Sequence, residues 1–124
     1  AIAIDPLDTN THYNLGGCLL RQSKSDLAID ALKKAVELEP AFEPALTNLG
    51  AAYLGKDLID LARQSLEKAI QVDPESVPAH YNLGIVYERL DRKKDAEREY
   101  KDALIADPKH VEAAKSLERL RGKK

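Results

Sequence analysis

The side chains best suited to chemistry in this chain are three asparagines that recur every 34 residues, Asn14, Asn48 and Asn82. A side-chain amide carries both donors and an acceptor, so a column of asparagines can bond the backbone of another chain without reading its side chains. Tyrosines and arginines, residue types that anchor many interfaces, stand at neighbouring positions. The same column can instead serve helix packing. The sequence leaves both interpretations, a binding ladder and a packing device, open.

Metal or catalytic chemistry would have to come from few residues. The soft metal ligands are His12, His80, His110 and Cys18. His12 and His80 share a column two repeats apart, whereas a structural zinc site needs four converging ligands. We therefore interpret them as packing histidines, and Cys18, which shares its column with Ala52 and Val86, as a small core residue. No nucleophile with a base and an orienting partner is recognisable, so we predict no catalytic residue, no metal, no cofactor and no enzyme activity.

These residues belong to a tandem repeat. Pairs of an acidic residue and a proline recur every 34 residues without insertion or deletion, at Asp5-Pro6, Glu39-Pro40, Asp73-Pro74 and Asp107-Pro108. A period of this length indicates an array of one structural unit, and we set the units at 9–42, 43–76 and 77–110. In such an array each unit buries its apolar face against its neighbours rather than in one central core.

Each unit is predicted to form two antiparallel helices joined by a tight turn. In the first half, residues 12, 15, 16 and 19 follow the spacing of one helical face and are mostly apolar or small. Ala28, Leu32 and Ala35 repeat that pattern in the second half. The segments between the halves are rich in turn and capping residues. Because the residue before proline is pushed out of helical geometry, each proline ends a second helix.

Small residues recur where the two helices of a unit would cross. Glycine inside a helix costs about 0.5–1 kcal/mol relative to alanine, so the recurring glycines need a compensating contact. We predict that they face the recurring alanines of the second helix and let the two backbones approach closely. The predicted pairs are Gly16 with Ala28, Gly50 with Ala62 and Gly84 with Ala96.

The columns together resemble the tetratricopeptide repeat (TPR) family. In the second unit the matching residues are Leu46, Leu49, Gly50, Tyr53, Ala62, Leu66, Ala69 and Pro74. The other units match in the same columns, with His12 and His80 where the family often has tryptophan and Leu19 where it has tyrosine. The resemblance covers nearly the whole chain. It implies an all-α fold, a right-handed superhelical solenoid of antiparallel helix pairs.

The two ends continue the repeat in different ways. Residues 1–6 match 69–74, so residues 1–8 are predicted to be the remnant of a preceding second helix, and the chain to be part of a longer array. Residues 111–124 continue in phase with Leu117 in the leucine column, but Glu118 replaces the glycine. A charged residue cannot serve the same close crossing. We therefore predict a capping helix and a basic tail at the end of the array.

In TPR proteins the inner stripe of each first helix lines a concave groove. On this register the resemblance implies a peptide-binding set of Tyr13, Asn14, Arg21, Thr47, Asn48, Leu54, Tyr81, Asn82, Ile85, Arg89, Lys115 and Arg119. Some family members clamp a C-terminal carboxylate with lysines, asparagines and an arginine. Of the corresponding columns here only Asn48 fits, so that mode of binding is not expected. The asparagine column is similar instead to that of protein O-GlcNAc transferases and related bacterial arrays.

We therefore predict a protein–protein interaction module whose concave groove takes an extended peptide or a helix of a partner protein. Two other interpretations stay open: a self-assembling scaffold that stacks through repeat ends or convex faces, including the N-terminal repeat end, and the substrate-recognition arm of a larger enzyme. A net charge of −2 favours neither nucleic acid nor membrane as a partner, and no apolar run approaches membrane-spanning length. A cytoplasmic location is favoured, although an upstream targeting sequence would change it.

Overall fold

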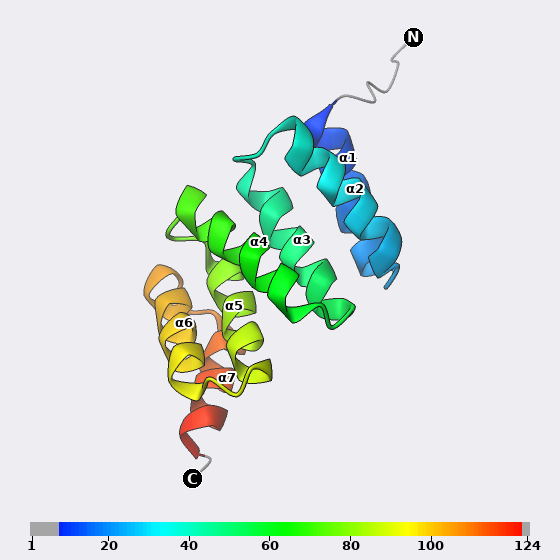
Figure 1. Ribbon diagram of the computed structural model, residues 1–124. Helices are drawn as coiled ribbons and strands as arrows, with labels where there is room; N and C mark the ends of the chain where they lie inside the picture. The colour runs from blue at the N-terminus through cyan, green and yellow to red at the C-terminus, as the bar shows by residue number, and fades with distance from the viewer. Residues whose placement is uncertain (1–7, 123–124) are drawn as a thin grey trace.

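The computed structural model describes residues 8–122, and within this range the chain forms seven helices and no strand. The helices are α1 (Thr9–Arg21), α2 (Ser25–Leu38), α3 (Glu43–Gly55), α4 (Ile59–Val72), α5 (Val77–Arg89), α6 (Lys93–Ala106) and α7 (Val111–Gly122). Each predicted unit contains one packed pair, α1 with α2, α3 with α4 and α5 with α6 (Figure 1). The architecture is the predicted all-α solenoid. No helix among the described residues is long and apolar enough to cross a membrane.

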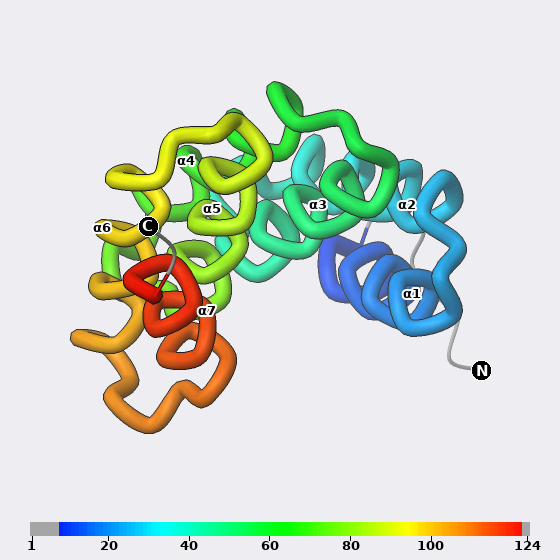
Figure 2. Tube along the Cα trace, turned by 90° about the horizontal axis from the view of Figure 1, so that it is seen from below, coloured from blue at the N-terminus to red at the C-terminus, as the bar shows by residue number. Residues whose placement is uncertain are grey.

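The helix pairs are arranged as an arch. Figure 2 shows α1, α3, α5 and α7 along its inner side and α2, α4 and α6 along its outer side. Consecutive units are joined where α2 packs on α3 and α4 packs on α5. The inner helices also contact one another, α1 with α3 and α3 with α5, and α7 packs on α6. The inner helices therefore carry the concave surface.

The ends of the helices follow from the local sequence. Asp8 caps α1 by accepting a hydrogen bond from the Asn10 N–H at 3.0 Å. Ser76 caps α5 in the same way, accepting from the Ala79 N–H at 3.3 Å. Each outer helix ends two residues before a proline, and the residue between them leaves helical geometry; these residues are Glu39, Asp73 and Asp107.

The turn inside each unit has the same geometry three times. One residue in each turn adopts a left-handed backbone, with φ of 61° at Ser23, 60° at Asp57 and 59° at Asp91. A residue other than glycine is uncommon in this region, and aspartate is among the better tolerated. These residues are 34 positions apart, so the period of the sequence is also a period of the backbone.

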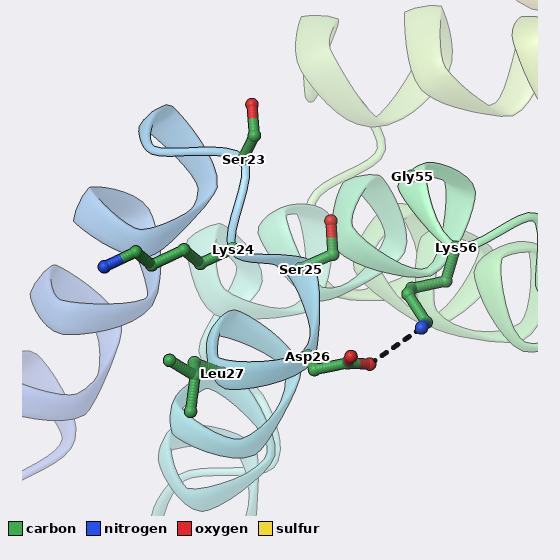
Figure 3. A pocket seen from close by; sticks show the side chains of 7 residues that line it. All are labelled: Ser23, Lys24, Ser25, Asp26, Leu27, Gly55 and Lys56. Carbon is green, nitrogen blue, oxygen red and sulfur yellow. Dashed lines mark ion pairs between the residues drawn. The ribbon is translucent and has the colours of Figure 1, made fainter.

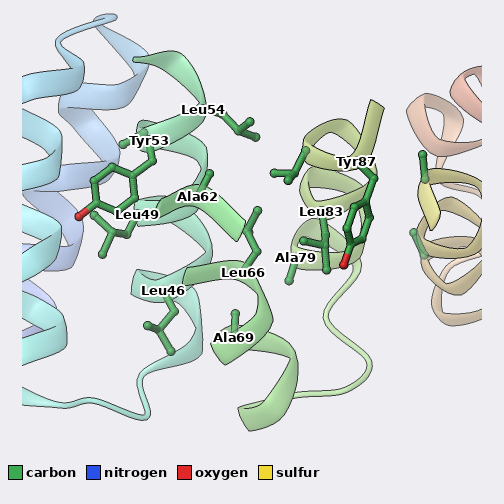
Figure 4. Close-up of a cluster of buried hydrophobic side chains, with 14 of the residues drawn as sticks. Leu46, Leu49, Tyr53, Leu54, Ala62, Leu66, Ala69, Ala79, Leu83 and Tyr87 are labelled. Carbon is green, nitrogen blue, oxygen red and sulfur yellow. The ribbon is translucent and has the colours of Figure 1, made fainter. Parts of the chain in front are cut away.

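The core runs along the arch between the inner and outer helices. Figure 4 shows how side chains of α3, α4 and α5 meet within it. The alanine column of the second helices is fully buried, and so is the column four residues later; the two columns are Ala28, Ala62 and Ala96, and Leu32, Leu66 and Tyr100. Burying a large apolar side chain stabilises the fold by roughly 1.5–3 kcal/mol. The core is therefore assembled from one similar layer per unit.

The glycines of the inner helices make room for a large side chain of the outer helix, one turn after the predicted alanine. A Cβ added at Gly16 would lie 2.5 Å from Cγ of Leu32, closer than real contacts allow. The later units repeat this contact at the same distance, in the pairs Gly50–Leu66 and Gly84–Tyr100. The nearest atoms therefore belong to the residue four positions after the predicted alanines, and Ala28, Ala62 and Ala96 are themselves fully buried. The glycine is needed because a large buried side chain of the outer helix lies directly against it.

The first unit is more exposed than its sequence columns predict. Leu15 is 50% exposed, whereas its equivalents Leu49 and Leu83 are 5% and 3% exposed. Cys18 is exposed as well, although its equivalents in the other units are fully buried. The prediction that Cys18 is a core residue is therefore wrong. In the second and third units the preceding outer helix packs on this face, and within residues 8–122 no helix precedes α1.

The helix α7 has one buried face and one exposed face. Ala113, Leu117 and Leu120 are buried, and α7 packs on α6. Glu118, which stands in the glycine column, is exposed. The backbone of α7 therefore does not need the close crossing made by the glycines of the other inner helices, because no further outer helix lies against it within the described residues.

Candidate peptide-binding face

The predicted binding residues all lie on the inner helices of the arch (Figure 2). Those that are exposed are Asn14, Arg21, Arg89, Lys115 and Arg119. Those that are half-buried are Tyr13, Asn48, Tyr81, Asn82 and Ile85. Thr47 and Leu54 are buried. All but these two are therefore at least partly accessible to solvent.

The asparagine column is not used to tie the helices together. None of the amide side chains of Asn14, Asn48 and Asn82 makes a hydrogen bond to another described residue. The amide of Asn48 reaches toward α1, since a Cβ placed on Gly17 would lie 3.8 Å from its Nδ2 atom. The donors and acceptors of these amides are thus left on an accessible surface.

Thr47 and Leu54 were predicted to line the groove, and their burial contradicts this. The Thr47 hydroxyl donates to Oε2 of Glu43 at 2.5 Å, and the same oxygen accepts from the Ser76 hydroxyl at 2.7 Å. Because Ser76 caps α5, this network joins the start of α3 to the start of α5. Leu54, 7% exposed, points toward α5 (Figure 4). Both residues are buried under the concave surface and do not line it.

Between α5 and α7 the inner face is hollowed into a cavity of about 280 Å³. Its lining residues are Tyr81, Ile85, Glu88, Arg89, Tyr100, Ser116 and Arg119. Four of them, Tyr81, Ile85, Arg89 and Arg119, were predicted as binding residues. Asn82 and Lys115 do not line the cavity. The structure therefore brings the C-terminal part of the predicted set together in one place.

Glu88 lines this cavity and accepts hydrogen bonds from two other helices. Nη1 and Nη2 of Arg119 each donate to its carboxylate at 2.8 Å, and the Tyr100 hydroxyl donates to Oε1 at 2.5 Å. Burial, together with this carboxylate, raises the pKa of Tyr100, so its hydroxyl stays protonated and can donate. The hydrogen bonds to Glu88 likewise raise the pKa of Arg119. The carboxylate thus links α5 to α6 and α7.

Aromatic rings and a second arginine complete the cavity. The ring centroid of Tyr81 lies 5.8 Å from that of Tyr100 and 5.3 Å from that of His110. Nη1 of Arg89 lies 3.2 Å from Oδ1 of Asp57 and 3.3 Å from a backbone oxygen of α3. Because the Asp57 side chain is 79% exposed, this ion pair is worth about 1 kcal/mol or less. Arg89 is therefore held in place weakly and can change partner.

Three of the lining residues, Glu88, Tyr100 and Ser116, are outside the predicted binding set. Tyr100 was placed in a packing column where the other units have leucine. Its hydroxyl was the available signal, because a buried tyrosine usually directs its polar tip to a partner. Glu88 lies on the predicted inner stripe beside Arg89. Its partner Arg119 is 31 positions away, and no local rule of sequence pairs the two.

The other end of the face, on α1, has fewer fixed contacts. The Tyr13 ring packs edge-on against Phe42, with ring centroids 5.4 Å apart. Nη2 of Arg21 lies 3.3 Å from Sγ of Cys18. Asn14 is exposed between them. This end of the face presents the predicted residue types without a network that fixes them.

A second hollow, of about 440 Å³, lies at the turns of the first two units (Figure 3). Nζ of Lys56 pairs there with Oδ1 of Asp26 at 3.0 Å. The two side chains are 41% and 77% exposed, so the pair contributes about 1 kcal/mol or less. The ion pair in this hollow links adjacent turns. We consider the cavity between α5 and α7 the better candidate site.

The fold and the concave face are those of a TPR domain, and sequence comparison agrees. Residues 2–106 match the profile of the cilia and flagella-associated protein 70 middle TPR-like domain. Because this match spans most of the chain, the chain belongs to that family of TPR domains. No curated protein sequence gives a significant match.

Several solved structures superimpose closely on the chain. The Arabidopsis OM64 TPR domain has a TM-score of 0.89 at 25% identity, covering 94% of this chain and 96% of that one. MamA has a TM-score of 0.86 at 28% identity, with coverage of 94% and 68%. The first TPR of Spaghetti (RPAP3), solved with the HSP90 peptide SRMEEVD, has a TM-score of 0.88 at 22% identity, with coverage of 98% and 96%.

Proposed function

We propose that the chain is a protein-interaction module that binds an extended peptide of a partner protein along its concave face. The observation that carries the proposal is the cavity on the inner side of α5 and α7, which gathers predicted binding residues from two helices. A TPR domain of the same fold, the first TPR of Spaghetti, was solved with a peptide bound. The proposal assigns no catalytic role to the chain.

The asparagine column supplies contacts to the peptide backbone. Packed helices lie about 8–10 Å apart, and an extended peptide rises about 3.3 Å per residue. One asparagine per unit can therefore meet the backbone every few residues. Asn14, Asn48 and Asn82 have no hydrogen bond to give up among the described residues, so binding does not cost an existing contact.

The cavity supplies preference for particular side chains. Tyr81 and Ile85 offer an apolar surface, and Arg89 and Arg119 offer two guanidinium groups at the rim. Both arginines are 47% exposed and paired with carboxylates of the chain itself, so an acidic group of a ligand can replace those partners. A peptide with an acidic residue beside an apolar one is therefore the preferred ligand.

A random-peptide phage library panned on the chain tests this function, with affinities of the selected peptides measured by fluorescence anisotropy. Replacing Asn14, Asn48 and Asn82 together by alanine should weaken binding more than about tenfold, since each lost hydrogen bond costs about 0.5–1.5 kcal/mol. Gln64→Ala, an exposed amide on the outer helix α4, is the matched control and should bind as the unchanged chain does.

Circular dichroism and light scattering complete that test. The triple variant should keep the helical signal and thermal transition of the unchanged chain. Unfolding of the variant would mean that the asparagines are packing devices. A folded variant that binds as tightly as before would place the ligand on another face. Oligomers that grow with protein concentration would favour the self-assembling scaffold instead.

A further inference from the structure

The third unit combines a histidine with two carboxylates that neither other unit has, and these three side chains meet in space. His80, Glu99 and Asp102 each offer a metal-ligand atom, and these atoms lie within 4.8 Å of one another. The equivalent residues are Leu46, Ser65 and Lys68 in the second unit, and His12, Ala31 and Lys34 in the first. The repeat fold is thus built without this trio. A departure from the pattern in one unit, with charged groups at a buried position, points to a local function.

The histidine of this trio is held as metal-binding histidines commonly are. His80 and Glu99 are buried, at 7% and 6% exposed. Nε2 of His80 donates to the carbonyl of Pro74 at 2.7 Å, which fixes the ring and leaves Nδ1 facing Oε1 of Glu99 at 2.8 Å. A bond from the second ring nitrogen to a backbone carbonyl is a usual feature around a bound metal. Asp102 follows Glu99 by three residues and so lies on the same face of α6.

We propose that His80, Glu99 and Asp102 bind a divalent transition-metal ion such as Zn²⁺. Metal–nitrogen and metal–oxygen bonds are about 2.0–2.2 Å long, so two ligands at the tetrahedral angle that Zn²⁺ prefers lie about 3.4 Å apart. Nδ1 of His80 and Oε1 of Glu99, now 2.8 Å apart, need to separate by only about 0.6 Å to hold the ion in place of the shared proton. Asp102 is half-buried, and rotation of its side chain brings the third ligand in.

One imidazole and two carboxylates suit a first-row transition ion better than Mg²⁺ or Ca²⁺, which prefer ligand sets made of oxygen. The trio lines a hollow of about 480 Å³, with Glu67 and Gln71 of α4 also in its wall. The hollow has room for water ligands. Three carboxylates face it against the cation of Arg98, which lies 3.6 Å from Oε2 of Glu99. The balance of charge favours a cation.

The site is tested by calorimetric titration of the chelator-treated full chain with Zn²⁺. We expect one ion per chain. Asp102→Asn, which leaves the buried His80–Glu99 pair in place, should weaken binding about tenfold or more. Glu97→Gln removes the same charge from the same helix outside the hollow and should change nothing.

A second variant distinguishes loss of the metal ion from loss of the fold. His80→Leu with Glu99→Ser copies the pair Leu46 and Ser65, which the second unit already accommodates. It should keep its helical signal and lose the ion. In the unchanged chain, Zn²⁺ should shift the imidazole NMR signals of His80 and not those of His12 or His110. Absence of one-to-one binding, or equal affinity in the double variant, would overturn the proposal.

Discussion

The first and third units share most of their sequence columns, yet they present different surfaces. Leu15 in the first unit is 50% exposed, and its equivalent Leu83 in the third is 3% exposed. The exposed side of the first unit forms an apolar hollow of about 450 Å³, lined by His12, Leu15, Leu19, Leu27, Asp30, Ala31 and Lys34. The third unit is covered on that side by α4. A repeat therefore encodes a packing face, and the neighbouring unit decides whether that face is buried.

The same contrast applies to the concave side. On α1 the predicted binding residues carry few fixed contacts, and Asn14 is exposed. On α5 they are organised by neighbours, since Glu88 accepts from both Arg119 of α7 and Tyr100 of α6. A following helix thus converts a stripe of residues into a cavity. Four expected outcomes test this comparison, from the largest effect to the smallest.

Removing residues 111–124 should have the largest effect, because it makes the third unit as open at its C-terminal side as the first unit is at its N-terminal side. The buried face of α7, formed by Ala113, Leu117 and Leu120, would be lost, and the apolar surface of α6 beneath it would become exposed. We expect association or aggregation in size-exclusion chromatography with light scattering. A monomeric and equally soluble truncated chain would contradict the capping role of α7.

Equivalent leucines should differ in their contribution to stability. Leu49→Ala opens a cavity in the core and should lower the free energy of unfolding by about 2–5 kcal/mol. Leu15→Ala, in the same column but half exposed, should lower it by about 1 kcal/mol or less. Urea denaturation followed by circular dichroism measures both. Equal losses would show that the face of α1 is covered in solution.

Enlarging a buried alanine should cost less than deleting a buried leucine. Ala62 is fully buried between α3 and α4, so Ala62→Leu should lower the free energy of unfolding by about 1–3 kcal/mol through overpacking. Gln64→Leu, an exposed position on the same helix, is the control for leucine itself. A thermal transition like that of the unchanged chain in Ala62→Leu would show that the helix crossing is misplaced.

The smallest effect concerns pH and distinguishes His80 from His12, its equivalent in the first unit. The folded-state pKa of His80 is raised by Glu99, so protonated His80 stabilises the fold. This stabilisation is complete below the unfolded pKa of about 6.5 and is lost as pH rises through the raised folded value. With a chelator present, the unchanged chain should lose stability over that interval relative to His80→Leu with Glu99→Ser. Parallel stability curves would contradict this assignment.

Much of the fold could be predicted from the sequence, because the period, the turn residues and the prolines act locally. The burial of individual side chains could not be predicted in the same way. Helical periodicity placed Thr47 and Leu54 on the inner stripe, but contacts of α3 with α5 bury them. Cys18 was expected in the core because its column is apolar, and it is exposed because no described helix packs there. Burial depends on neighbours that the column itself does not specify.

The candidate site shows the same division. The residue types of the cavity, Tyr81, Ile85, Arg89 and Arg119, follow from the inner stripe of the repeat. The contacts that organise them do not, because Glu88 and Arg119 are 31 positions apart and belong to different helices. Asn82 and Lys115 lie on the same stripe and outside the cavity. The sequence columns thus identify the concave face, and tertiary contacts determine which of its residues form the cavity.

The most direct test of the central claim, binding of a peptide on the concave face, is an NMR titration of the ¹⁵N-labelled chain with a phage-selected peptide. We expect the largest chemical-shift changes on the inner helices, at Asn14, Asn48 and Asn82 and around the cavity at Tyr81 and Arg89. Signals of the outer helices α2, α4 and α6 should change least. Shift changes confined to those outer helices, or to the apolar hollow of the first unit, would contradict the account.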